Sequence, residues 1–258
     1  MTAFAQPESM RMNSAQGKQV LSVVRGGDFA HPGEVEAIKM VFADLGSNPQ
    51  RKLLDVGCGL GGTAEEVSKL GFGVVTGLDN DRPTIEYALT TYPRHSFVCG
   101  DASDLSTTVP GPFDLVYMFN ALYTMPDQRK VLTQCAAVCP AGGELRIFDY
   151  FIRSTDDRAR IFAETYEGSR WQPLAIDQVQ ALFAGTGWQI VEMRDISTDY
   201  ARWYKALVAG IESCKDQILA MAGQQWFEHA LTKYRGYAKA AEDGVVGGLV
   251  LRATREVP

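Results

Sequence analysis

The most constraining feature of this chain is a short apolar run that passes directly into a glycine-rich turn. Residues 53–64 have the sequence LLDVGCGLGGTA, in which the run reaches Asp55 and glycines then recur up to Gly62. Glycines permit the positive φ angles of a tight turn and let a ligand approach the backbone closely. A helix-like segment at 63–70 follows, and its free N-terminal N–H groups could meet an anionic group. This order of strand, turn and helix predicts the first unit of a nucleotide-binding α/β domain.

The spacing of these glycines is compatible with more than one ligand. Gly57, Gly59 and Gly62 fit the G-x-G-x-x-G spacing of dinucleotide sites. The D-x-G-x-G-x-G spacing of S-adenosylmethionine (SAM) sites is also present, in Asp55, Gly57, Gly59 and Gly61. A plain structural turn would also use glycine, so the rest of the chain has to decide.

Composition narrows the classes of function. The chain has 258 residues and a net charge of −6 without a dense basic run, which disfavours nucleic acid as a partner. We find no secretory signal peptide and no run of membrane-spanning length, and we predict no membrane partner. Five scattered cysteines are typical of reduced thiols in a cytoplasmic protein. Cys135 and Cys139 could form a metal pair, but the histidines are isolated, so buried thiols are favoured and no metal site is predicted.

Alternating apolar runs and helical segments indicate a mainly parallel sheet. Because parallel strands need crossovers, ligands are expected at the carboxyl ends of the strands. The central strands are predicted at 52–56, 73–78, 96–99, 113–119 and 143–149, with helices between them at 63–70, 82–90 and 128–139.

The two ends of the chain differ from this pattern. Residues 1–16 are polar and predict a frayed end, and an amphipathic helix is predicted at 33–46. Further strands are predicted at 188–193 and 247–254. We therefore expect an N-terminal segment and cap helix at 1–46. A cofactor-binding domain at 47–258 should carry helical insertions at about 151–175 and 200–240.

Three polar positions follow predicted strands. Asp79 lies 22 residues after Gly57, where an acid can accept two hydrogen bonds from a ribose diol. Asp101 can accept from an exocyclic adenine amine, while the Ala102 N–H can donate to a ring nitrogen. Asn120 should lie at the switch point of the sheet, near the amino-acid end of a SAM molecule.

Together these motifs resemble the class I SAM-dependent methyltransferase superfamily. The resemblance covers about residues 20–254 and implies a Rossmann-like, doubly wound α/β fold. Its seven-stranded sheet would be mainly parallel, with an antiparallel last strand and helical lid insertions. It also implies transfer of a methyl group from SAM to a small-molecule metabolite by in-line displacement, leaving S-adenosylhomocysteine. The matching motifs are 53–61, 75–79, 100–102, 113–120 and 140–149, followed by a closing hairpin at 188–193 and 247–254.

The resemblance also implies roles for single residues. The glycine turn would lie against the methionine part of SAM, Asp79 would hold the ribose, and Asn80 or Asp81 would flank the adenine. The implied cofactor-binding residues are Asp55, Gly57, Cys58, Gly59, Gly61, Asp79, Asn80, Asp101, Ala102 and Asn120.

The methyl acceptor is less constrained, and its reactive group could be an amine, a hydroxyl or an acid. The layout is loosely similar to the phosphoethanolamine, glycine/sarcosine and dimethylglycine N-methyltransferases. His31 lies in a glycine-containing segment, where it either meets the ligands or only flanks a helix. Tyr123 and Tyr150 follow the fourth and fifth strands, on the acceptor side of this fold. These three residues are the catalytic candidates, although the sequence identifies no general base.

Two questions remain open at this level. The aromatic residues of the later helices could recognise a cationic amine or simply pack in the core, and we expect one or two to line a pocket. The chain could also be a SAM-binding regulatory or scaffold protein, or an NAD-dependent oxidoreductase, and either a monomer or a homodimer. The aromatic residues are Trp171, Tyr200, Trp203, Tyr204, Trp226 and Tyr237.

Overall fold

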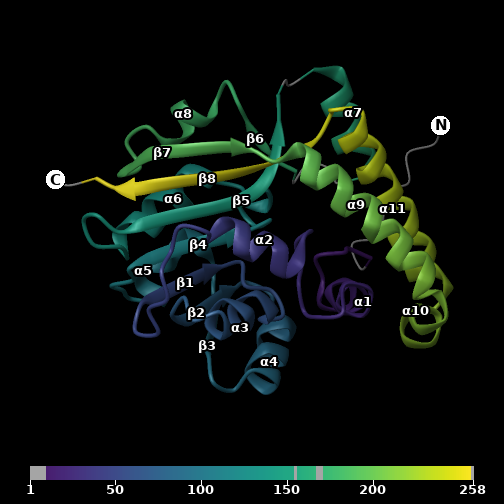
Figure 1. Cartoon of the computed structure of the whole chain (residues 1–258), viewed down its shortest axis with the longest axis horizontal. Helices are drawn as coiled ribbons and strands as arrows, with labels where there is room; N and C mark the ends of the chain where they lie inside the picture. Colours follow the sequence, from purple (N-terminus) through teal and green to yellow (C-terminus); the bar gives the residue numbers. More distant parts are fainter. Residues whose placement is uncertain (1–9, 154–155, 167–170, 257–258) are drawn as a thin grey trace.

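The computed structural model describes residues 10–153, 156–166 and 171–256. Its centre is one eight-stranded sheet, in which seven strands follow the order β3-β2-β1-β4-β5-β8-β7 and β6 pairs with β5 (Figure 1). The strands are β1 (Lys52–Val56), β2 (Val74–Asp79), β3 (Ser96–Cys99), β4 (Leu115–Phe119), β5 (Glu144–Ile152), β6 (Leu174–Ala175), β7 (Trp188–Asp195) and β8 (Gly247–Arg255).

The sheet confirms the predicted fold class. Strands β1 to β5 pair in parallel, and β8 pairs antiparallel with both β5 and β7. The two-residue strand β6 was not predicted; it pairs in parallel with the last residues of β5. Strand β5 runs three residues beyond the predicted end at 149, because β8 pairs with it as far as Phe151.

Each face of the sheet packs into its own apolar core. Along β4, Leu115, Tyr117 and Phe119 join one core, whereas Val116 and Met118 join the other. This alternation is the period-two pattern of a strand that is covered on both faces. A sheet covered on both faces is therefore the structure that a strand such as β4, apolar at every position, predicts.

Helices cover both faces and one end of the sheet. Helices α2 and α3 contribute to the first core, and α6 and α8 to the second. The helices are α1 (Ala15–Arg25), α2 (Glu34–Val41), α3 (Gly62–Lys69), α4 (Arg82–Thr91), α5 (Leu105–Thr108), α6 (Gln128–Ala137), α7 (Asp157–Tyr166), α8 (Val179–Phe183), α9 (Ser197–Ser213), α10 (Lys215–Ala222) and α11 (Gln224–Glu242).

Helix α1 overturns the expectation of a frayed start, as far as the described residues reach. Residues 1–9 lie outside the described part, but Met12 is buried at 4% exposure and Ser14 caps the helix. The Gly17 N–H donates to Ser14 Oγ at 3.3 Å, and Gly26 ends the helix with a φ of 63°. The polar composition of 1–16 was misleading because a few apolar side chains suffice to hold this segment in place.

The long C-terminal helices lie beside α1. Figure 1 shows α9, α10 and α11 packed together at one end of the sheet, and α1 contacts both α9 and α10. Segments from the two ends of the chain therefore meet at the same edge of the fold, and they enclose the space described next.

Candidate active site

A cavity of about 450 Å³ opens at the carboxyl ends of the parallel strands. This is the edge where a doubly wound sheet binds ligands. Its walls come from α1, from the loops after β1, β2, β3 and β4, from β5 and from α11. The cavity brings together nine of the predicted site residues: Gly57, Gly59, Asp79, Asn80, Asp101, Ala102, Asn120, Tyr123 and Tyr150.

The glycine turn forms the floor of the cavity. Gly57 has a φ of 81°, and a Cβ there would lie 2.5 Å from the Cβ of Ala121. Both the φ angle and this close approach require glycine. The N–H groups of Gly57 and Cys58 donate to the Leu78 carbonyl, at 2.7 and 3.0 Å. The turn is thereby fixed to the end of β2.

Two members of the predicted turn lie elsewhere. Gly61 is not among the residues that line the cavity; a Cβ on it would meet the rings of Phe97 and Tyr92. Cys58 is buried beneath the turn, and burial raises the pKa of its thiol well above the ordinary value. The Cys58 side chain is therefore a protonated packing group.

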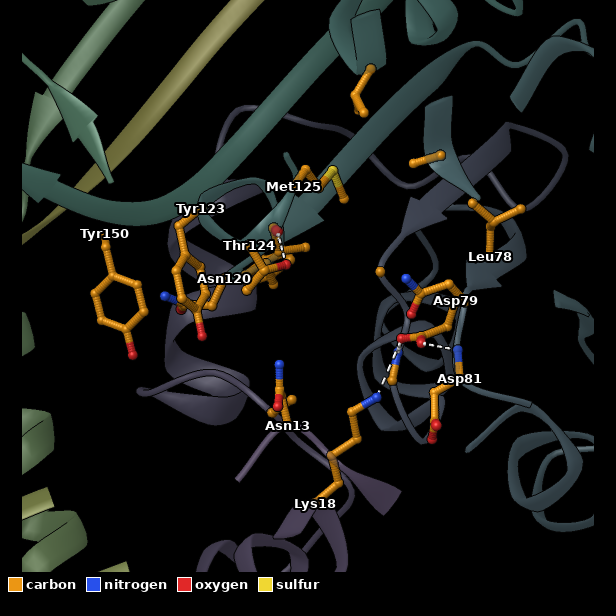
Figure 2. Close-up of a pocket in the computed structure, with 18 of the residues that line it drawn as sticks. Asn13, Lys18, Leu78, Asp79, Asp81, Asn120, Tyr123, Thr124, Met125 and Tyr150 are labelled. Atoms are coloured by element: carbon orange, nitrogen blue, oxygen red, sulfur yellow. Dashed lines mark hydrogen bonds and ion pairs between the residues drawn. The ribbon is translucent and has the colours of Figure 1, made fainter. Parts of the chain in front are cut away.

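Asp79 is held in a fixed orientation at the end of β2. Its Oδ2 accepts from the Gly59 N–H at 2.9 Å, and its Oδ1 accepts from the Asp81 N–H at 3.0 Å. The ammonium of Lys18, on α1, lies 3.4 Å from Oδ2 (Figure 2). A preorganised carboxylate of this kind suits a ligand that carries hydroxyl donors.

Asp101 and Ala102 line the same end of the cavity. Asp101 Oδ1 accepts from the Ser103 N–H at 2.7 Å, and this bond lowers the pKa of the carboxyl below its ordinary value. Asp101 caps the 3₁₀ turn that begins at Ala102, and Asn80 lines the cavity nearby. The carboxylate is therefore ionised, and the turn holds it in place.

Asn120 lies between the two halves of the cavity (Figure 2). Its φ is 48°, a left-handed conformation that non-glycine residues seldom adopt and that costs about 1–3 kcal/mol. Its Oδ1 accepts from the Tyr200 hydroxyl at 3.1 Å, whereas its buried Nδ2 has no partner within the described residues. Backbone strain of this kind is common at functional sites, and Asn120 lines the cavity.

Asp55 is buried behind the glycine turn and is not a lining residue. Burial raises the pKa of its carboxyl to about 8, and this effect outweighs the nearby Tyr117 hydroxyl, which lowers the pKa. The carboxyl in turn adds to the burial that raises the pKa of Tyr117. Asp55 Oδ2 makes no hydrogen bond of standard geometry in the described part of the chain. The side chain can therefore contact a ligand only if the turn or the side chain shifts.

His31 is also absent from the cavity wall. The residue is 1% exposed, and its ring lies against Phe119 with 4.5 Å between ring centroids. The two ring nitrogens contact the Pro32 carbonyl and Thr63 Oγ1, both at 3.1 Å. Burial lowers the pKa of His31 to about 3, so the imidazole is neutral at physiological pH. This placement matches a structural residue more closely than one that meets ligands.

The other end of the cavity is lined by tyrosines. The rings of Tyr123 and Tyr150 are perpendicular, with centroids 4.7 Å apart, and Tyr234 and Tyr237 of α11 line the same space. Tyr150 shares a hydrogen bond with the buried Tyr204 hydroxyl. Burial raises the pKa of Tyr150 well above its ordinary value, so this group is a phenol rather than a base.

Of the helical aromatic residues singled out in the sequence, only Tyr237 lines the cavity. Trp203, Tyr200 and Tyr204 belong to the core, with 6% exposure or less, and Trp226 packs against it. The expectation that one or two would line a pocket is thus met.

Several lining residues were not predicted. Met12, Asn13 and Lys18 come from the segment around α1, and Tyr234 comes from α11. Asp149, at 0% exposure, anchors the tyrosine end because its carboxylate accepts from the Tyr150 N–H at 2.7 Å and burial raises its pKa to about 7. An acid within an apolar run was the one sequence signal for it.

Two searches of the described ranges bear on metals and membranes. Over 10–153, 156–166 and 171–256, no three His, Cys, Asp or Glu side chains group as metal ligands. In the same ranges no helix combines the length and apolar character needed to cross a bilayer. Cys135 and Cys139 are both free and buried.

Comparison with known proteins agrees with this geometry. The model of a methyltransferase domain family matches residues 54–147. The O-methyltransferase rstn1 of Aspergillus nomiae is 30% identical over 159 residues, which cover 59% of this chain and 70% of that protein. The 27-O-demethylrifamycin SV methyltransferase of Amycolatopsis mediterranei is 28% identical over 209 residues, covering 76% of this chain and 75% of that protein.

Solved structures share the fold. A Haemonchus contortus phosphoethanolamine N-methyltransferase 2, solved with phosphomonomethylethanolamine and S-adenosylhomocysteine, superposes with a TM-score of 0.82 at 17% identity. The match covers 98% of this chain and 62% of that one. The family match, the relatives and the preorganised cavity at the strand ends lead to one conclusion: this chain belongs to the class I SAM-dependent methyltransferases.

Proposed function

We propose that the chain binds SAM in the cavity at the strand ends and methylates a small metabolite through an amine, hydroxyl or acid group, with S-adenosylhomocysteine as the second product. The observation that carries this proposal is the division of the cavity into two chemically different halves. Carboxylates and backbone N–H groups line one half, and tyrosines line the other. Asn120, with its unpaired amide, lies between them.

The residues present fit SAM. Asp79 and Asp101 offer fixed carboxylate oxygens to hydroxyl and amine donors, and the Ala102 N–H lies at the same end. Gly57 and Gly59 both line the cavity and bring backbone without side chains to its wall. SAM, when bound, supplies an activated methyl group on a sulfonium. We assign Asn120 to the methionine part, because it lines the cavity between the carboxylate end and the tyrosine end.

The chain's own contribution is alignment and exclusion of water. The tyrosine end is built from rings in mutual contact, and Asp149 fixes the backbones of Tyr123 and Tyr150 through bonds of 3.2 and 2.7 Å. An in-line displacement gains most from such positioning. We propose Tyr123 and Tyr150 as acceptor-side residues. The low pKa of His31 and the raised pKa of Tyr150 argue against either as a general base.

This arrangement favours an acceptor that needs no strong base. A neutral amine, a phenolate or a carboxylate is already nucleophilic, whereas an alcohol oxygen is a weak nucleophile until it loses its proton. We further propose an N-terminal cap at 1–46 and a SAM-binding domain at 47–258, active in the cytoplasm as a monomer or homodimer.

Titration calorimetry with SAM and NAD, side by side, tests the cofactor. We expect micromolar binding of SAM and none of NAD. Incubation with SAM and fractionated metabolite pools should then yield S-adenosylhomocysteine only in fractions that hold the acceptor. A protein that binds NAD but not SAM would refute the proposed function.

A further inference from the structure

Lys18 is the one cation in contact with Asp79 among the described residues. Its ammonium lies 3.4 Å from Asp79 Oδ2, and the side chains of the pair are 9% and 10% exposed (Figure 2). Lys18 is carried by α1, whereas Asp79 ends β2. The contact therefore joins a helix from the start of the chain to the centre of the predicted ribose site.

The hydrogen-bonding capacity of Asp79 is nearly exhausted. An ionised carboxylate has about four lone-pair sites. Three donors already occupy Asp79: the N–H groups of Gly59 and Asp81 and the Lys18 ammonium. A vicinal diol brings two further O–H donors, so one of the present donors has to leave.

The three donors differ in their freedom to leave. The Gly59 and Asp81 N–H groups belong to the backbone, and the turn around Gly59 is fixed to β2 through bonds to Leu78. Lys18 reaches Asp79 through a flexible four-carbon stem. It also has a second partner at the same distance of 3.4 Å, Thr84 Oγ1, whose hydroxyl is itself bonded to Asp81 Oδ2. Lys18 can therefore give up Asp79 and remain hydrogen-bonded.

We infer that Lys18 tunes the affinity of the cofactor site: its ammonium occupies Asp79 in the free protein and so weakens the binding of any ligand whose vicinal diol has to displace it. This inference rests on the proposed function, because it takes Asp79 as the ribose acceptor. A ligand without the diol leaves the Lys18–Asp79 pair intact. A ligand with the diol has to break that contact, which makes its binding free energy less favourable.

Removal of the ammonium tests the inference through binding alone. Lys18→Met keeps most of the side-chain length, and Lys18→Gln is a second variant in case the first folds poorly. Calorimetry with adenosine should give a dissociation constant about three- to tenfold lower in either variant than in the unsubstituted protein. With 2′,3′-dideoxyadenosine the change should be less than about twofold, because no diol competes for Asp79.

A matched control removes a positive charge outside the cavity. Lys69, on the surface of α3, is not a lining residue and pairs with Glu65 at 3.2 Å, so Lys69→Met should change adenosine binding less than about twofold. If the unsubstituted protein binds SAM but both Lys18 variants bind adenosine no more tightly than it does, the inference is overturned and the cofactor site stands. Absence of both SAM and adenosine binding in all proteins would overturn the proposed function and the inference together.

Discussion

Replacement of His31 by phenylalanine should make the protein resist mild acid. The ring lies among Phe29, Phe119 and Phe148, so an aromatic replacement keeps the surroundings apolar. Burial lowers the pKa of His31 from 6.5 to about 3 in the folded protein. The His31 imidazole therefore binds a proton below pH 6.5 in the unfolded chain, but only below about pH 3 in the folded chain. Stability from this group is present above pH 6.5 and is lost as the pH falls toward 3.

The magnitude follows from these two pKa values. Protonation of His31 in the unfolded chain raises the unfolding equilibrium constant by a factor of about thirty at pH 5. At pH 7 the factor is little more than one. The difference corresponds to about 2 kcal/mol of unfolding free energy between pH 7 and pH 5. The loss of the Thr63 hydrogen bond costs a further ~1 kcal/mol, but this cost is the same at both pH values.

Urea unfolding followed by circular dichroism, at pH 7 and pH 5, measures the effect. The unsubstituted protein should lose about 2 kcal/mol more than His31→Phe between the two pH values. All other titrating groups are shared, so they cancel in this comparison. An equal loss in both proteins would show that His31 is protonated in the fold and refute its buried, neutral state.

Three further predictions concern the cavity. Asp79→Ala should weaken SAM binding by about 1–3 kcal/mol, measured by calorimetry, because the diol loses its acceptor; an unchanged affinity would contradict the ribose assignment. Gly57→Ala should lower the thermal midpoint through a cost of about 1–3 kcal/mol, since the added Cβ meets Ala121 and the φ angle is strained. Ala121→Gly in the same protein should restore part of that loss, and no recovery would argue against the contact. For Asp55→Asn, the unfolding free energy relative to that of the unsubstituted protein should rise by about 1 kcal/mol for each pH unit between pH 5 and pH 7. The folded Asp55 carboxyl has a pKa of about 8, so its contribution is present at acid pH and lost as the pH rises; parallel urea curves across this range would refute it.

The parts of the site that follow strands were predictable because strand ends are fixed by a simple pattern. Asp79, Asp101 and Asn120 each follow an apolar run, and parallel strands bring their carboxyl ends to one edge. Asp55 was harder, because a strand residue can point to either face, and its neighbours Leu54 and Val56 pack in the core opposite to that of Leu53. The pattern of the chain predicts the position of Asp55 along the strand but not its burial.

The walls of the cavity were less predictable, since they depend on contacts between distant segments. Lys18 reaches Asp79 only because α1 packs on α9 and α10, far away in sequence. His31 offered two equal interpretations, and its burial among Phe29, Phe119 and Phe148 is visible only in the structure. A single sequence contains no direct signal for such contacts.

The cavity takes its walls from both ends of the chain, from Met12 to Tyr237. During synthesis the glycine turn and Asp79 emerge long before α11, so a nascent chain holds the cofactor-side groups before it holds the tyrosine wall. The tyrosine wall, and with it the exclusion of water, exists only after the last helix has docked. The complete cavity therefore exists only in the finished molecule.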